Sequence, residues 1–351
     1  MRRQEFRFVS FCLLFLMCLA LVACGAAEAS EEDIEAQWAS SAHADAEARA
    51  FTRWDDADPP EIPTNCAKCH STPGYLDFHG ANDSPVGEVS QPASIGTTVE
   101  CDVCHSELTA DKTEAVMPSG QLLEELGPNA NCMECHQGRA SGIGVGEALA
   151  DIETGDDVVN TEISAPSIHN SPAGPLQYGV EAHGGFEYPG KEYAGRYDHT
   201  GGFDSCIACH DAHTLTIDAR RCHVCHIKAV DFASLRNIRT SNIDFDGDGD
   251  NTEGIFREIL TIEERLLEQI ELYVNVTEGV EPIVIDGRFT NEDGEAYTTW
   301  TPRLLRAAYN YQFSALSGGS YVHNPRYTLQ LLYDSYEDLG GVMRGMTRPE
   351  S

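Results

Sequence analysis

The chain has 351 residues and is strongly acidic, with 23 lysine and arginine residues against 57 aspartate and glutamate residues and a formal net charge of −34. This charge argues against nucleic acids and anionic membrane surfaces as partners, because both repel an acidic protein. The length allows one large domain or two ordinary domains.

Residues 1–23 have the pattern of an export signal peptide. Three arginines near the N-terminus precede the apolar run VSFCLLFLMCLALV, which is too short for an ordinary membrane-spanning helix. The segment ends in LVACG, which resembles the lipobox of bacterial lipoproteins and implies cleavage before Cys24 and acylation of that cysteine. An ordinary cleavage site with an incidental cysteine is the alternative. We therefore expect an exported protein that is anchored by lipid on the outer side of the cytoplasmic membrane, or on the outer membrane or cell surface.

Residues 24–36 follow as an acidic stretch that contains GAAEASEEDIEA. Small and charged residues bury too little apolar surface to fold alone, so we expect a flexible tether between the lipid and the folded part. The later apolar runs are too short to span a bilayer, so the lipid anchor is the expected contact with the membrane.

Residues 37–230 contain five Cys-x-x-Cys-His motifs, which together use ten of the 13 cysteines. Disulfides, zinc sites and iron–sulfur sites do not explain a histidine directly after every second cysteine. Haem c does, because its vinyl groups form thioethers with two cysteines one helical turn apart, and the next residue then ligates the iron. The expected thioether residues are Cys66, Cys69, Cys101, Cys104, Cys132, Cys135, Cys206, Cys209, Cys222 and Cys225. The expected proximal iron ligands are His70, His105, His136, His210 and His226.

The sixth ligand of each iron decides the chemistry, because a closed iron passes electrons whereas an open one can transform a small molecule. Eight further histidines exceed the five that are needed, which favours bis-histidine ligation. His213 follows His210 by three residues and cannot reach the far face of its own haem, so it is expected to ligate a neighbouring iron. His199 lies in a glycine-containing loop, and His323 lies just before an expected helix, which is a rigid place from which to present an imidazole.

Several phrases of the chain resemble one group of bacterial multihaem cytochromes: SAHADAEARAFTRW, CAKCHSTPGYLDF, CMECHQGR, FEYPGKEYAGRYDH, CHDAHT and HNPRYTLQLLYDS. The resemblance covers roughly His43 to Leu339 and implies bis-histidine haems that transfer electrons across or outside the cell envelope. Together with the positions above, it favours as distal ligands His43, His169, His199, His213 and His323. His79 and His183 rank lower, and His223 is expected only to line the haem environment.

The spacing of the motifs also predicts an arrangement. Only 11 residues separate His210 from Cys222, so the last two haems are expected to be neighbours. Residues 140–203 have no motif and are rich in glycine, proline and serine, so we expect an irregular loop region that carries His169 and His199 to other haems. The expected fold class is mainly α with much irregular loop: a multihaem cytochrome c core plus a C-terminal helical cap with a small β-hairpin.

Residues 231–351 form a haem-free region that begins with the acidic stretch SNIDFDGDGDNTEG. Its alternating aspartates and central glycine match the first half of a calcium-binding loop. The match fails at Ile255, where a bidentate glutamate belongs, and Glu253 or Glu258 is the candidate replacement. A solvated acidic turn is the alternative. The candidate calcium ligands are Asp244, Asp246, Asp248, Asp250 and Glu253.

The rest of this region has clear helical and turn signals. Apolar residues at spacings of three and four predict a core-facing helix, and an Asp-Gly pair indicates a hairpin turn. The predicted elements are a helix from Gly254 to about Val274, a hairpin with Asp293 and Gly294 at its turn, and two helices that begin after Thr301 and Asn324. We expect the region to pack on the haem half, because His323 should reach into it; a separate interaction domain is the alternative.

The expected function is that of an electron carrier with five haem c groups, and not that of an enzyme. The expected partners are other cytochromes or a membrane quinol-oxidising complex. One alternative is a multihaem reductase of a small oxyanion with one open haem, although the chain has no Cys-x-x-Cys-Lys variant motif. Another is a self-assembling cytochrome filament, in which a histidine of one subunit ligates a haem of the next.

Overall fold

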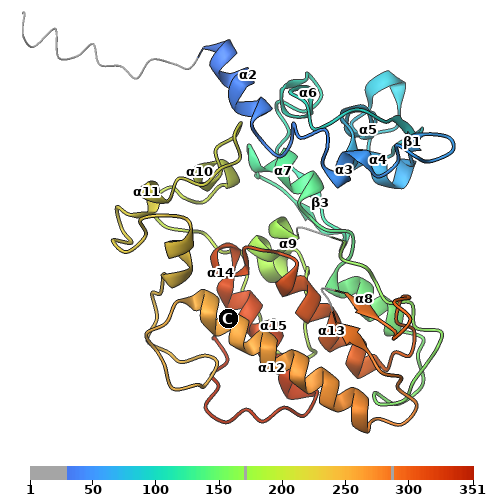
Figure 1. Cartoon of the computed structure of the whole chain (residues 1–351), viewed down its shortest axis with the longest axis vertical. Helices are drawn as coiled ribbons and strands as arrows, with labels where there is room; N and C mark the ends of the chain where they lie inside the picture. The colour runs from blue at the N-terminus through green and yellow to red at the C-terminus, as the bar shows by residue number, and fades with distance from the viewer. Residues whose placement is uncertain (1–29, 170–171, 286–287) are drawn as a thin grey trace, which may run out of the picture.

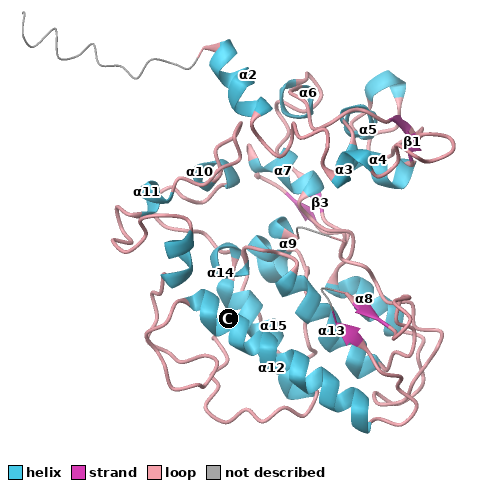
Figure 2. Cartoon of the chain, in the orientation of Figure 1, coloured by secondary structure: helices cyan, strands magenta, loops and turns pink. Residues whose placement is uncertain are grey.

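The computed structural model describes residues 30–169, 172–285 and 288–351. The expected signal peptide and the candidate lipidation site Cys24 lie outside these residues. Within the described ranges the chain is mainly helical, with three antiparallel sheets of two short strands each (Figure 2). This agrees with the mainly α class that the sequence predicts. No helix in these ranges is both long enough and apolar enough to cross a lipid bilayer.

The N-terminal half consists of short helices joined by long loops (Figure 1). Its elements up to the third motif are α2 (Glu31–Ala39), α3 (Arg49–Thr52), β1 (Glu61–Ile62), α4 (Thr64–His70), α5 (Thr72–Phe78), η1 (Ala81–Asp83), β2 (Ala93–Ser94), α6 (Asp102–His105), β3 (Ala115–Val116), β4 (Leu122–Leu123) and α7 (Asn129–Cys135). β1 pairs with β2 and β3 pairs with β4, both antiparallel. The last two motifs lie on α10 (Cys206–Cys209) and at the end of α11 (Ala219–Cys222).

The acidic stretch expected to be a flexible tether is helical from Glu31 onward. Ser30 caps α2, and its hydroxyl accepts from the backbone N–H of Asp33 while the Asp33 carboxylate accepts from the backbone N–H of Ser30. Three acidic residues in the first turn also complement the helix dipole. The indole of Trp38 then donates to the carbonyl of Val99 at 2.9 Å, which attaches this helix to the second motif. From Glu31 onward this stretch is therefore a docked helix, whereas its composition predicts a flexible tether.

The region between the third and fourth motifs, expected to be irregular, contains α8 (Gly142–Leu149), α9 (Ala173–Tyr178) and η2 (Gly179–Glu181). The sequence signal for α8 is hidden by three glycines, which normally weaken a helix. Gly142 is required at its position, because a Cβ there would lie 1.8 Å from the carbonyl oxygen of Gly185. The close approach lets the Gly142 N–H donate to the carbonyl of His183.

Two alanine substitutions in α8 are expected to have opposite effects. Gly142→Ala should destabilise the protein by more than about 2 kcal/mol, because the new methyl group collides with backbone that cannot move aside. Gly146→Ala is the matched control: nothing lies within 4 Å of its added Cβ, so it should stabilise the helix by about 0.5–1 kcal/mol. Urea denaturation followed by circular dichroism measures both. Equal effects of the two substitutions would contradict the close contact.

The C-terminal part is a layer of helices (lower half of Figure 1). Its elements are η3 (Ala233–Asn237), α12 (Ile255–Val276), β5 (Val284–Ile285), β6 (Phe289–Thr290), α13 (Pro302–Ala315), α14 (Ser320–His323) and α15 (Pro325–Asp338). α12, α13 and α15 pack against one another and enclose the largest apolar core of the described chain. The caps agree with the sequence, since Thr301 accepts from the N–H of Leu304 and Asn324 from the N–H of Tyr327. Local capping thus determines where these two helices begin.

The predicted hairpin lies partly elsewhere. β5 and β6 form the antiparallel pair, so the ladder joins residues 284–285 to residues 289–290 and lies before the predicted turn. The turn at Asp293 and Gly294 does exist, but it closes only a single bridge between Thr290 and Ala296. An Asp-Gly pair favours a turn locally, but the pairing of the flanking strands decides where a ladder extends.

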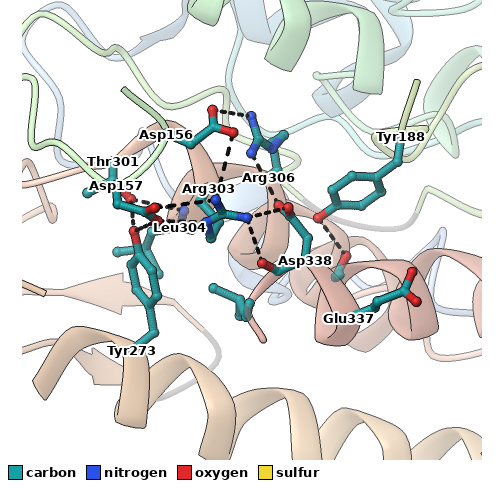
Figure 3. Close-up of polar contacts among 12 residues, drawn as sticks. Asp156, Asp157, Tyr188, Tyr273, Thr301, Arg303, Leu304, Arg306, Glu337 and Asp338 are labelled. Atoms are coloured by element: carbon teal, nitrogen blue, oxygen red, sulfur yellow. Dashed lines mark hydrogen bonds and ion pairs between the residues drawn. The ribbon is translucent and has the colours of Figure 1, made fainter. Parts of the chain in front are cut away.

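An ion cluster ties the loop at residues 156–157 to the C-terminal helices (Figure 3). Arg303 pairs with Asp157 at 2.6 Å and with Asp338 at 2.5 Å. Arg306 pairs with Asp156 at 3.1 Å and also reaches Asp338 at 3.2 Å. The two guanidinium groups therefore join α13 to α15 and to the loop that follows α8.

Hydrogen bonds also join the segment after α9 to the C-terminal helices. The backbone N–H of Phe186 donates to the side chain of Asn310 at 2.7 Å, and the Tyr193 hydroxyl donates to Asp334 at 2.7 Å. The side chain of Asn324 donates to the carbonyls of Gln177 and Gly195. These bonds fix α14 against α9, and they hold His323 at the boundary between the two halves.

The apolar core is distributed unevenly. In the described N-terminal half, two further clusters contain only eight and three buried residues. So small a core supplies little stabilisation for a region of this size. A bound prosthetic group with a large apolar surface would supply the missing core.

Candidate functional site

Each Cys-x-x-Cys-His motif forms about one helical turn. In four of them, the backbone N–H of the histidine donates to the carbonyl of the first cysteine, at 2.8–2.9 Å. The remaining motif, which is the first in the chain and runs from Cys66 to His70, lies entirely inside α4. This geometry places the two thiols of a motif on one side of a turn, with the histidine directly after them. All ten cysteines are free, and each of these residues is at least partly exposed.

The structure brings each motif histidine close to a second histidine from elsewhere in the chain. In four of these pairs the two ring planes meet at angles between 17° and 77°. The ring centres lie 6.3 Å apart for His136 and His43, 5.9 Å for His70 and His169, 6.4 Å for His105 and His213, and 6.1 Å for His226 and His199. The remaining motif histidine is His210, in the fourth motif. It lies close enough to His323 for their charges to interact.

These separations fit one metal ion between two imidazoles. A metal–imidazole nitrogen bond is about 2.0 Å long and the nitrogen lies about 1.1 Å from its ring centre, so two rings opposite each other on one ion have centres about 6.2 Å apart. The partners are the five histidines that the sequence favours as distal ligands.

Backbone carbonyls orient several of the rings. The Nδ1 atom of His70 lies 2.8 Å from the carbonyl oxygen of Ala50, and Nδ1 of His199 lies 3.0 Å from that of Thr200. Nδ1 of His210 lies 3.4 Å from the carbonyl of Leu215. In the tautomer that donates through Nδ1, the Nε2 atom keeps its lone pair and can bind a metal.

The surroundings of five of these ten histidines favour the neutral imidazole, which is the form that ligates iron. Burial lowers the pKa of His323 to about 4, assisted by His210 and His136. Desolvation likewise lowers the pKa of His136 to about 4, although part of this residue remains exposed. Burial also lowers the pKa of His43, His70 and His169.

The third motif lies at the centre of the group. The thiols of Cys69 and Cys135 interact, and the Cys69 thiol also contacts the carbonyl of Glu134 at 3.8 Å. The thiol of Cys132, in the same motif as Cys135, interacts with the thiol of Cys206 in the same way. The second motif joins the third through the Asn131 side chain, which donates to the carbonyl of Thr109 at 3.0 Å. Cys209 and Cys222 lie near each other, which places the fourth and fifth motifs side by side.

A buried ion triad, which no pattern in the sequence indicates, holds the first three motifs together. The Glu134 carboxylate, inside the third motif, pairs with Lys68 of the first motif at 2.7 Å and with Lys112 at 3.0 Å. Only 3% of the Glu134 side chain is exposed. Burial alone would raise the pKa of Glu134, but the two ammonium groups outweigh it and hold the pKa below its ordinary value. A residue between two motif cysteines looks like a spacer in the sequence, so only the fold identifies its role.

The remaining histidines have other neighbours within the described ranges. His79 packs against Tyr75 and Phe78. His183 pairs with Glu187 at 2.9 Å. His223 is exposed at the C-terminal end of α11. None of the three faces another described histidine ring at the spacing of the four pairs.

The acidic loop before α12 brings most of the candidate calcium ligands together. Asp246, Asp248 and Glu253 form one group of carboxylate oxygens, and Asp244, Asp246 and Glu258 form another. The side chain of Asp250 belongs to neither group. It is exposed and accepts hydrogen bonds from Thr252, so this expected ligand instead stabilises the turn before α12.

The chain was compared with known proteins. No family model and no curated protein matches it. Among solved structures, it is similar to an undecaheme cytochrome from the S-layer of Carboxydothermus ferrireducens, with a TM-score of 0.38 and 14% sequence identity. The match covers 83% of this chain and 40% of that chain, so the present chain spans well under two thirds of the length of its structural neighbour.

Proposed function

We propose that this protein is a pentahaem c-type cytochrome that carries electrons and does not transform a substrate. One observation carries the proposal: every Cys-x-x-Cys-His motif has a second histidine near its own, and in four pairs the ring spacing fits a metal ion between them. Paired axial histidines leave no open position for a substrate. The small apolar core of the N-terminal half is a second, independent support.

The protein residues have three tasks in this function. The ten motif cysteines hold the haem groups through thioethers, and the ten paired histidines hold the irons. The haems supply reversible one-electron chemistry. The carbonyls of Ala50 and Thr200 fix the orientation of their histidines, and the Glu134 triad fixes the motif helices relative to one another. Contacts of the third motif with its neighbours favour a continuous series of closely spaced haems.

The same pairs favour a carrier that is complete within one chain. All ten axial histidines come from the chain itself, so a histidine from a second subunit is not required. We propose that the carrier is exported, anchored through lipid on Cys24, and exchanges electrons with other cytochromes or with a membrane quinol-oxidising complex.

Two measurements on protein extracted from membranes test the proposal. Intact mass should correspond to cleavage before Cys24 with added acyl chains and five haems. Ferric absorption and EPR spectra should show only low-spin iron, and the reduced protein should not bind CO. A high-spin haem that binds CO would instead support a reductase, and fewer than five haems would contradict the motif assignment.

A further inference from the structure

The acidic loop at residues 244–253 has no part in the haem function, yet it is built as a site. Carboxylate oxygens of Asp246, Asp248 and Glu253 lie within 4.8 Å of one another. Three negative charges at this spacing repel one another strongly unless a cation or protons lie between them.

Two of these carboxylates have an oxygen with no protein partner. Asp246 is 0% exposed, and its Oδ2 atom accepts no hydrogen bond. Oε1 of Glu253 is also buried and has no partner. A buried charged oxygen without a partner is costly, so such atoms normally indicate a missing ligand. Burial and the neighbouring carboxylates raise the pKa of Asp246 to about 6 and that of Glu253 to about 7, although a backbone hydrogen bond from Asp248 and the Thr261 hydroxyl oppose the rise at Asp246.

The other two acidic residues of the loop are already used to hold its shape. Asp244 accepts hydrogen bonds from backbone N–H groups of two glycines, at 2.6 and 2.8 Å. Glu258 pairs with Arg239 and accepts from two further backbone N–H groups, at 2.8 and 2.9 Å. These contacts hold the loop in place, whereas Oδ2 of Asp246 and Oε1 of Glu253 have no protein partner.

We propose that Asp246, Asp248 and Glu253 together bind one calcium ion. The ligands are all oxygens, which is the preference of a hard cation, and the irregular loop suits the flexible coordination of calcium better than the strict octahedron of magnesium. Glu253 takes the place of the glutamate that an EF-hand loop has at the position of Ile255. Backbone carbonyls and water complete the coordination.

The ion would stabilise the attachment of the C-terminal segment. The loop touches that segment directly: a Cβ on Gly247 would lie 2.5 Å from the backbone of Gly345, and the N–H of Thr347 donates to the carbonyl of Phe245 at 3.0 Å. The guanidinium group of Arg265, on α12, donates to the carbonyl of Asp246. Calcium thus connects the start of α12 to the end of the chain.

Calorimetric titration of the full-length, EDTA-treated haem protein with calcium chloride tests the proposal. The wild type should bind one calcium ion per chain, and magnesium chloride should bind far more weakly. Asp246→Asn should weaken calcium binding at least ~10-fold, because it removes a charged ligand. Asp250→Asn is the matched control: it makes the same chemical change in the same loop at an exposed side chain, and affinity should not change.

Two further measurements separate a lost site from a misfolded protein. Far-ultraviolet circular dichroism of Asp246→Asn should match the wild type; if it does not, Glu253→Gln takes its place. Hydrogen exchange at residues 343–351 should slow when calcium is added to the wild type, but not to the variant. Absence of calcium binding by the wild type, equal affinity of the two aspartate variants, or equal affinity for magnesium would each overturn the proposal. None of these outcomes depends on whether the haem assignment is correct.

Discussion

Replacing His43 with alanine is expected to convert one of the five haem irons from low spin to high spin and to create one site for CO. His43 faces His136 with ring centres 6.3 Å apart, and it lies in the loop between α2 and α3, far from any motif in the sequence. The Cys132 and Cys135 thioethers and His136 would remain, so the haem should stay attached while its iron loses one axial ligand. The change requires no rearrangement of the motif helices.

Ferric absorption, EPR and CO difference spectra of the purified variant measure this change. About one fifth of the iron should become high spin, with an equal stoichiometry of CO binding. The control is His223→Ala, which removes an exposed imidazole from inside the fifth motif and should leave all five irons low spin. A fully low-spin His43→Ala protein would remove His43 from the ligand set, and high-spin iron in His223→Ala would show that His223 is a ligand.

Replacing Glu134 with glutamine is expected to lower the free energy of unfolding by about 2 to 3 kcal/mol, because it leaves Lys68 and Lys112 without their shared carboxylate. The same change at Glu337 is the control. Glu337 pairs with Lys191 at the surface, where 48% of its side chain is exposed, so Glu337→Gln should cost less than about 0.5 kcal/mol. Urea denaturation followed by the Soret band measures both variants. Similar losses in both would show that the triad contributes no more than a surface ion pair.

The effect of Glu134 should depend on pH in a defined direction. The pKa of Glu134 is lowered in the folded protein, because the two lysines outweigh the effect of burial. Its contribution is therefore fully present above the unfolded pKa of about 4.3 and is lost as the pH falls through the lower folded value. The difference in stability between the wild type and Glu134→Gln should shrink below about pH 4. A difference that grows on acidification would contradict this sign.

Much of the C-terminal fold is predictable because its signals are local. Thr301 and Asn324, each followed by proline, determine where α13 and α15 begin, and the apolar spacing of α12 determines which face is buried. The misplaced hairpin shows the limit of this reasoning, since strand pairing depends on residues outside the turn. The helix α8 was missed because glycine normally disfavours helices, whereas Gly142 serves a close backbone contact.

The calcium-loop pattern was predictable in part for the same reason. Alternating aspartates and a glycine are a local signal, and Asp246 and Asp248 do lie together in the structure. The position of Glu253 beside them depends on how the loop meets α12. The exposure of Asp250 also depends on the folded loop, in which its carboxylate accepts hydrogen bonds from Thr252.

The sequence by itself identified the five Cys-x-x-Cys-His motifs and predicted haem attachment at them, because thioether chemistry needs two cysteines one helical turn apart and the next histidine can then ligate the iron. It also showed that eight histidines lie outside the motifs, which exceeds the five that paired ligation would need. Only the tertiary structure decided the pairing: His43 lies opposite the third motif, His169 opposite the first, and His213 opposite the second. Each histidine pair joins segments far apart in the chain. No local sequence pattern predicts which loop packs against which motif. The burial of Glu134 between two lysines has the same origin, since charge in a sequence does not reveal which charges the fold will enclose.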